Sequence, residues 1–150
     1  VEAARPGARI EGVLVQPEVE GAVAELLLGT IADEQFGPVV LVGFGGILAE
    51  VLDDTALGVA PLAEADARRM LGELRGARLL QGFRGRPPGD LAAVSRAVVA
   101  LARLAADLED SVAEVDVNPL LVLPEGRGVL AVDALVALVP ERVAPEGRAD

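Results

Sequence analysis

The order of the apolar runs leaves few folds open to this 150-residue chain. Short runs rich in Leu and β-branched residues come first, two stretches with helical spacing follow, and a second pair of β-type runs closes the sequence. Strands that alternated with helices would indicate a parallel sheet, whereas this order indicates an α+β layer. We therefore expect one domain with a mainly antiparallel sheet packed against two principal helices. Before the helices, the runs expected to form strands are 13–16, 22–30, 39–43 and 47–52.

Two apolar stripes predict the helices. The first follows Pro61 and ends near Gly76; its stripe consists of Ala63, Ala67, Met70, Leu71 and Leu74. The second begins with Asp90 as its N-cap; its stripe consists of Leu91, Val94, Val98, Leu101, Ala105 and Leu108. Asp53, Asp54 and Gly58 are expected in turns, and Phe36 is expected in the core beside a strand-entry turn. Residues 1–9 and 140–150 lack periodicity, so we expect flexible ends around a lobe at 10–139.

The composition excludes several classes of site. The chain is 52% hydrophobic with a net charge of −11, and its thirteen cationic residues are all Arg and are scattered along the sequence, so nucleic-acid binding and membrane binding are not expected. It has no Cys, His or Lys, which excludes a thiol nucleophile, a phosphohistidine and a Walker-type lysine within these residues. No apolar run approaches the roughly 18 residues that span a bilayer. A cytoplasmic location is expected.

Oxygen-bearing side chains interrupt the closing pair of apolar runs. Asp116 and Asn118 alternate on one run, and a turn at Glu125 and Gly126 would set Asn118 opposite Asp133 on the next. Two carboxylates and an amide oxygen suit Mg²⁺, which shares its shell with water and phosphate. Two alternatives stay open: a pair of Asx turns flanking a hairpin, or a one-residue register shift that sends Asp133 to the other face.

Two glycine-rich segments are candidates for phosphate binding. Gly43, Gly45 and Gly46 join two runs, and successive amides in such a turn form an anion-binding nest; a plain glycine-rich β-turn is the alternative. Arg84 stands between two glycines in the loop that joins the helices, where its planar guanidinium can reach a phosphate. The alternative for Arg84 is an exposed basic loop that pairs with nearby acidic residues.

Five motifs occur at spacings that belong together. They are E-x-x-x-G-x-x-x-D-x-x-F-G-P at 25–38, G-x-G-G-x-x-x-E at 43–50, L-x-G-x-R-G at 80–85, E-x-D-x-N-P at 114–119 and D-A at 133–134. In this order they resemble one family, the ATP-grasp domain of the NDP-forming (ADP-forming) acyl-CoA synthetases, which are relatives of succinyl-CoA synthetase. The resemblance covers about residues 12 to 138 and is limited to the second, C-terminal ATP-grasp lobe.

The resemblance implies an enzyme, an acid–thiol ligase that forms acyl-CoA through an acyl phosphate and a phosphohistidine. Its cofactors would be ATP or ADP and Mg²⁺, held between two ATP-grasp lobes. Gln16, in the hinge strand, would lie beside the adenine. The other residues to which the resemblance gives roles are Gly43, Gly45 and Gly46 at the nucleotide, Arg84 in catalysis, and Asn118 and Asp133 at Mg²⁺ with Asp116 next to them.

The resemblance also implies partners. The first ATP-grasp lobe would bring a lysine to the phosphates, and a CoA-binding and phosphohistidine domain, in the same chain or a partner subunit, would carry the histidine. Because these 150 residues contain neither residue type, we expect a fragment that is inactive alone. The sequence departs from the family at Glu18, where Met is usual beside the adenine, and at Glu34, where Pro is usual.

Two other functions remain open at the level of sequence. One is a non-catalytic regulatory module, similar to the acyl-CoA-synthetase-like regions fused to protein acetyltransferases. The other is an acidic dimerisation module. The presence of Asp116, Asn118 and Asp133 favours the enzyme lobe.

Overall fold

The fold is built on a six-stranded antiparallel sheet. The computed structural model describes residues 7, 9, 11–13, 15, 18–46 and 54–140. The strands follow the spatial order β3-β2-β1-β4-β5, and β6 also pairs with β4. Their bounds are β1 Ala24–Asp33, β2 Gly37–Phe44, β3 Thr55–Val59, β4 Val112–Val122, β5 Val129–Ala131 and β6 Ala134–Leu138. The helices are α2 Glu64–Glu73, the short α3 Ala77–Leu80 and α4 Leu91–Asp107.

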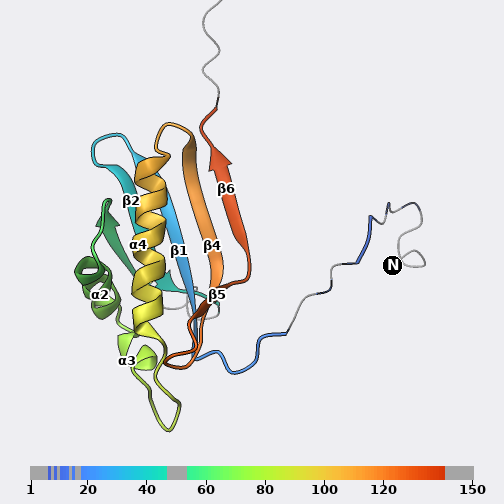
Figure 1. The fold of residues 1–150 in the computed structure, drawn as a ribbon, viewed down its shortest axis with the longest axis vertical. Coiled ribbons are helices and arrows are strands. Elements are labelled where there is room, and N and C mark those ends of the chain that lie inside the picture. The colour runs from blue at the N-terminus through green and yellow to red at the C-terminus, as the bar shows by residue number, and fades with distance from the viewer. Residues whose placement is uncertain are drawn as a thin grey trace, which may run out of the picture.

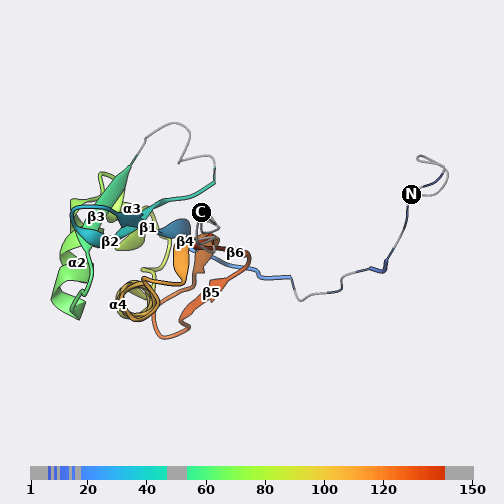
Figure 2. The same ribbon diagram turned by 90° about the horizontal axis from the view of Figure 1, so that it is seen from above.

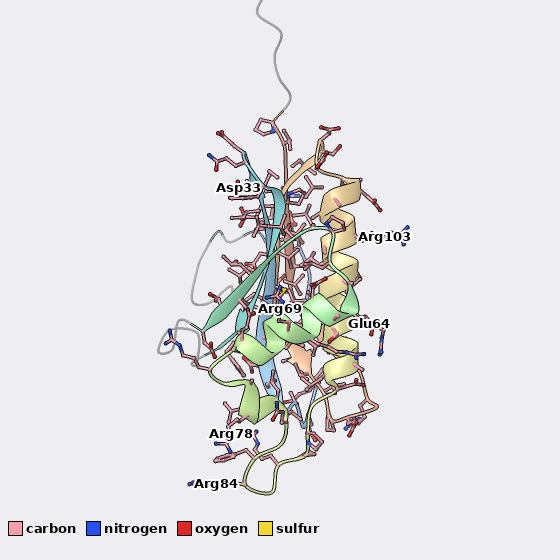
Figure 3. The ribbon with its side chains drawn as sticks, turned by 90° about the vertical axis from the view of Figure 1, so that its left-hand side faces the viewer. Asp33, Glu64, Arg69, Arg78, Arg84 and Arg103 are labelled. Atoms are coloured by element: carbon pink, nitrogen blue, oxygen red, sulfur yellow. The ribbon has the colours of Figure 1, made fainter. Side chains whose placement is uncertain are left out.

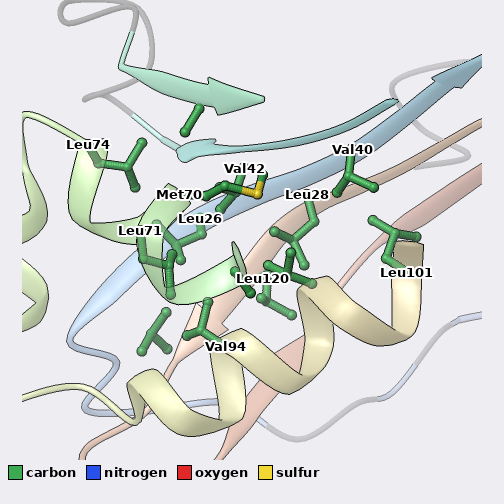
Figure 4. Packing of buried hydrophobic residues seen from close by; sticks show 14 of the residues in the cluster. Leu26, Leu28, Val40, Val42, Met70, Leu71, Leu74, Val94, Leu101 and Leu120 are labelled. Carbon is green, nitrogen blue, oxygen red and sulfur yellow. The ribbon is translucent and has the colours of Figure 1, made fainter. Parts of the chain in front are cut away.

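The helices cover one face of this sheet. Figures 1 and 2 show α4 lying along the sheet and α2 beside it near β3, both on the same side. The core fills the space between these layers, where side chains of β1 and β2 meet those of α2 and α4 (Figure 4). Its fully buried members include Leu26, Val42, Met70, Val94 and Val98. The expected α+β architecture with a mainly antiparallel sheet and two principal helices is therefore confirmed.

Several expectations about the N-terminal half need correction. The runs at 22–30 and 39–43 form β1 and β2, but Val13 and Val15 lie outside every strand and are 86% and 88% exposed. No strand among the described residues lies beside them to satisfy their backbone groups. The run at 47–52 falls outside the described residues.

Gly58 lies within β3, where a turn was expected. It pairs with Val40, and a Cβ atom at this position would lie 2.8 Å from Sδ of Met70 and 3.0 Å from Cδ2 of Leu62. Glycine is therefore needed here for close packing of α2 against the sheet, a role that the sequence does not distinguish from turn formation.

The turn between β1 and β2 is set by a side chain. The Oδ1 atom of Asp33 accepts the backbone N–H groups of Gln35 at 2.8 Å and Phe36 at 2.9 Å. These two bonds lower the pKa of Asp33, because both stabilise the charged carboxylate. Phe36, which was expected in the core, is 65% exposed at this turn.

Asp90 is the N-cap of α4, as expected. Its Oδ1 atom accepts the N–H of Ala93 at 2.9 Å, and its Oδ2 atom accepts the N–H of Gly128 at 3.0 Å. The carboxylate therefore connects the start of α4 to the turn between β4 and β5. The backbone bond from the N–H of Asp90 to the oxygen of Leu123, 2.9 Å long, strengthens the same connection.

The first helix is shorter than the spacing predicted. It ends at Glu73, and after a turn at Gly76 the chain forms α3. A Cβ atom on Gly76 would lie 2.5 Å from the ring of the fully buried Phe44. Glycine at this position therefore allows the α2–α3 connection to pack directly on the end of β2.

Two glycines in this region differ in the space around them: a Cβ atom has no room at Gly76 but open space at Gly72. The pair therefore gives a matched test. Gly76→Ala should lower the free energy of unfolding by about 1–3 kcal/mol, because the new methyl group overpacks the Phe44 ring. Gly72→Ala, in α2 with open space around its would-be Cβ, should raise it by about 0.5–1 kcal/mol through helix propensity. Urea unfolding of both variants measures the difference, and equal shifts would contradict the packing at Gly76.

Asp90 should make stability depend on pH in the acid range. The N–H groups of Ala93 and then Gly128 lower its pKa in the folded chain. The stabilisation is therefore fully present above the unfolded pKa of about 3.9 and is lost as the pH falls through the lower folded value. The difference in free energy of unfolding between the natural chain and Asp90→Asn should be constant from pH 7 to pH 5 and shrink below pH 4. A difference that persists unchanged in strong acid would contradict the cap.

Candidate functional site

Two of the candidate metal ligands face each other across a strand pair. The backbone N–H of Asn118 donates to the backbone oxygen of Asp133 at 3.2 Å. The same register continues along β6, where Val117 pairs with Ala134. Opposed residues of an antiparallel pair lie about 5 Å apart. The structure thus brings Asn118 and Asp133 together, in the register expected from the hairpin.

The third candidate, Asp116, belongs to the same face of the sheet. Val117 packs against the core below α4. Alternation counted from Val117 places Asp116 and Asn118 on the opposite face, which carries no helix. Ala134 pairs with Val117, so alternation places Asp133 on that face as well. The register shift that would separate Asp133 from Asn118 is not observed.

Most side-chain oxygen atoms of these three residues accept no hydrogen bond from the described residues. Asp133 accepts the N–H of Ala134 at 2.9 Å with its Oδ1 atom only. Within the described residues, the side chains of Asp116 and Asn118 take part in no hydrogen bond or ion pair. No group of three or more His, Cys, Asp or Glu side chains converges in this part of the chain, so the set consists of two carboxylates and one amide. Such a hard, incomplete oxygen set fits Mg²⁺, which retains waters and takes further ligands from phosphates.

A bulge in β4 lies at this site. The pairing of β4 with β1 shifts between Leu26 and Leu28, so that Asn118 and Pro119 together oppose the single residue Leu27. Bulges bend a strand and re-aim its side chains, and they are frequent beside active sites. The irregularity therefore coincides with the residue whose orientation matters most for a metal ligand.

The glycine turn lies in the same row of the sheet. Gly43 pairs with Leu27, and Leu27 lies beside Asn118. Neighbouring strands are about 4.8 Å apart, so Gly43 lies roughly 10 Å from Asn118. Gly45 donates its N–H to the oxygen of Glu25 at 2.8 Å, and Gly46 has φ +61°, a conformation that favours glycine.

A pocket of about 260 Å³ opens beside this turn. It lies at the end of β2, between the glycines, the start of β1 and α3. Its lining consists of Val23, Ala24, Glu25, Phe44, Gly45, Gly46, Leu79 and Arg86. Two charged residues, Glu25 and Arg86, therefore border a largely apolar space.

Arg84 lies away from this pocket. Figure 3 shows it at the tip of the loop that follows α3, beyond the end of the sheet. Its backbone has φ +50°, and its Cζ atom lies 5.3 Å from the centre of the Phe83 ring. The described residues do not bring Arg84 into contact with Asn118 or Asp133. A role for Arg84 thus depends on a ligand or a further part of the protein that reaches this tip.

Arg86 is the arginine that sequence reasoning missed. It stands two residues after Arg84 in the same loop, and it lines the pocket together with Gly45 and Gly46. The sequence singled out Arg84 because it stands between two glycines, and spacing alone does not tell which arginine of the loop lines the pocket. Gln16, the candidate beside the adenine, falls outside the described residues.

A second hollow, of about 240 Å³, lies on the helix-free face. Asp116 and Glu114 border it, and side chains of β1, β2 and β3 form its apolar floor. The lining residues are Leu27, Gly29, Thr30, Ile31, Val39, Leu41, Leu57, Glu114, Val115 and Asp116. The face that carries the oxygen side chains is therefore apolar towards β2 and β3.

Comparison with known families decides the class of this site. A family model described as an ATP-grasp domain matches residues 1–138. This chain belongs to the ATP-grasp family. None of the helices in the described part of this ATP-grasp chain is long and apolar enough to cross a membrane.

Several similar curated proteins are named as ADP-forming CoA ligases. The ATP-grasp chain is 37% identical over 134 residues to the acetate–CoA ligase (ADP-forming) II subunit beta of Pyrococcus furiosus, covering 89% of the chain and 56% of that subunit. It is 40% identical over 130 residues to the acetate–CoA ligase (ADP-forming) I of Archaeoglobus fulgidus, covering 87% of the chain and 19% of that protein. The chain therefore spans only part of these relatives.

Solved structures agree with this assignment. The acetyl-coenzyme A synthetase 1 of Candidatus Korarchaeum cryptofilum, in complex with coenzyme A and Mg-AMPPCP, aligns with a TM-score of 0.74 and 38% identity, covering 81% of the ATP-grasp chain and 55% of that chain. A crystal structure of a Pyrococcus horikoshii protein aligns with a TM-score of 0.80 and 35% identity, covering 93% and 58%.

Proposed function

We propose that this chain is the second ATP-grasp lobe of an NDP-forming acyl-CoA synthetase, in which it binds Mg²⁺ and the phosphates of ATP or ADP. The observation that carries the proposal is the 3.2 Å bond between Asn118 and Asp133, which gathers oxygen donors on one sheet face in a chain whose relatives are ADP-forming ligases. The relatives named above do not favour the regulatory module. A cytoplasmic location stays a prediction.

The proposed division of labour follows from the chemistry of the side chains. Asn118 and Asp133 hold Mg²⁺, and Asp116 orients the site beside them. Mg²⁺ supplies neutralisation of the charge that develops on the phosphates during transfer. A span of roughly 10 Å between Asn118 and Gly43, the β2 residue just before the turn, is within the reach of one nucleotide. Gly46 and Arg86 then supply backbone and guanidinium contacts to anionic oxygens, while Gly45, whose N–H donates to the oxygen of Glu25, holds the turn.

The proposal includes parts that this chain lacks. Phosphoryl transfer to a histidine needs a histidine, and these residues contain none; they also contain no lysine for the phosphates. The first ATP-grasp lobe and a CoA-binding, phosphohistidine domain of the complete protein, or of a partner subunit, supply both. The isolated chain, which should not form acyl-CoA, therefore serves as the negative control in every activity test below.

Removal of a metal ligand should affect the rate more than the fold. In the complete protein, Asn118→Ala or Asp133→Ala should lower Mg-nucleotide-dependent turnover by about 100-fold or more, because each removes an oxygen from a cation that stabilises the transition state by several kcal/mol. Asp116→Ala should cost about tenfold if it only orients the site. Steady-state turnover at several Mg²⁺ concentrations, with circular dichroism for the fold, measures this.

The control for these variants is Asp110→Asn, an exposed carboxyl in the turn before β4. It should leave turnover and the Mg²⁺ requirement unchanged. Full activity in both the Asn118 and Asp133 variants would refute the metal site, and the hairpin would then be structural only.

The two loop arginines should differ in effect. Arg86→Ala should weaken nucleotide binding by about 10- to 150-fold, because one charge-assisted hydrogen bond contributes about 1.5–3 kcal/mol. Arg84→Ala, at the exposed tip, should act on transfer in the complete protein and leave the Mg²⁺ requirement unaltered. Calorimetric titration with Mg-nucleotide and single-turnover kinetics separate binding from transfer. Arg103→Ala, on the exposed side of α4 and paired with Asp107, is the matched control; equal losses in it and in Arg86→Ala would contradict a specific role.

A further inference from the structure

Asp54 is a buried carboxyl whose bonds connect two distant segments. It lies just before β3 and is only 4% exposed. Its Oδ1 atom accepts the N–H of Arg75 at 2.7 Å, and its Oδ2 atom accepts the N–H of Gly76 at 2.8 Å. These two amides stand between α2 and α3, so one side chain fixes the direction in which the chain enters α3.

The same residue is bound to the glycine turn through its backbone. The N–H of Phe44, which directly precedes Gly45 and Gly46, donates to the backbone oxygen of Asp54 at 3.2 Å. The ring of Phe44 packs against Gly76, with no room for a Cβ atom there. Asp54, Phe44 and Gly76 therefore form one tight junction between the end of β2 and the start of α3.

This junction defines a wall of the pocket beside the glycine turn. Phe44, Gly45 and Gly46 line one side, and Leu79 of α3 and Arg86 line the other. Helix α3 has only four residues and cannot hold its own position through helical hydrogen bonds. The bonds that Asp54 makes at Arg75 and Gly76 hold the start of α3, and the buried Leu80, whose oxygen accepts the N–H of Gly89 at 2.9 Å, holds its end.

We propose that Asp54 is a positioning residue for phosphoryl transfer, one that holds α3 and Arg86 against the glycine turn. The inference rests on the proposed function, because it gives the pocket a phosphate ligand. A carboxylate is suited to the task, since it offers an acceptor oxygen to each of two N–H groups. An asparagine offers one acceptor oxygen and directs its NH₂ group at the second N–H, so one bond is lost and two donors face each other.

The decisive experiment is a double-mutant cycle in the complete protein. Asp54→Asn should lower the single-turnover rate at subsaturating Mg-nucleotide about tenfold or more, because a misplaced Arg86 binds the phosphates less well, while the Mg²⁺ requirement and the circular dichroism stay unchanged. If Asp54 acts through Arg86, the pair Asp54→Asn with Arg86→Ala should be about as slow as Arg86→Ala alone. Losses that multiply, or full activity in Asp54→Asn, would overturn the inference.

The matched control is Asp66→Asn. Asp66 also accepts a backbone N–H, that of Ala63 at 3.0 Å, but it does so at the far end of α2 and does not line the pocket. It should leave the rate unchanged. The variants also separate this inference from the proposed function. If the complete protein bound no nucleotide and Arg86→Ala had no effect, the proposed function would be refuted. If Arg86→Ala were slow and Asp54→Asn fully active, only the positioning role of Asp54 would be refuted.

A second measurement uses the natural protein, so it does not depend on whether a variant folds. In the natural complete protein, hydrogen exchange at the amides of Arg75 and Gly76 should slow at least fivefold when Mg-nucleotide is added, because a ligand in the pocket restrains the wall that these amides form. The amide of Ala63 should exchange at the same rate with and without ligand. Binding without slower exchange at Arg75 and Gly76 would count against Asp54 as the positioning residue.

Discussion

The fold and the candidate site both depend on the pairing of β4. This strand lies between β1 on one side and β5 with β6 on the other, so it joins the N-terminal strands to the C-terminal hairpin. Its core-facing residues pack below α4, and the opposite alternation carries Asp116 and Asn118. A single register error in β4 would exchange the two sets, burying carboxylates and exposing the core. Stability and the proposed chemistry are thus fixed by the same backbone pairing.

Much of this arrangement could be predicted because it follows from local patterns. Helical spacing and the Asp90 N-cap identified α4, and alternation with a tight turn identified the hairpin that sets Asn118 opposite Asp133. The five motifs predicted the ATP-grasp family, which the family match confirms. The roles of Asp116, Asn118 and Asp133 as ligands stay predictions, because no comparison tests them residue by residue.

The predictions that the structure corrects concern residues whose contacts are with residues far apart in sequence. Gly58 pairs with Val40 in β3, where close packing of Met70 leaves no room for a Cβ atom, and Phe36 is exposed at the turn that Asp33 fixes. Asp54 was assigned to a turn, and nothing in its neighbours along the chain indicates the bonds to Arg75 and Gly76, which lie 21 and 22 residues away. Arg86 was missed for a similar reason, since only the folded loop shows which arginine lines the pocket.

Charge adds a last constraint on how such a lobe binds an anion. The chain carries a net charge of −11, which repels a nucleotide. Between residues 74 and 89, however, there are four arginines and no acidic residue, and α3 and its loop bring this segment to the end of the sheet where the pocket opens. At physiological ionic strength charges are screened beyond about 8 Å, so a ligand at the pocket experiences chiefly the two charged residues that line it, Arg86 and Glu25. The carboxylates of Asp116 and Asp133 lie on the helix-free face in the same part of the sheet, and there only a bound cation makes phosphate binding favourable. The proposed site therefore needs both contributions, guanidinium groups at the glycine turn and metal at the hairpin, and the loss of either should weaken binding even when the fold is intact.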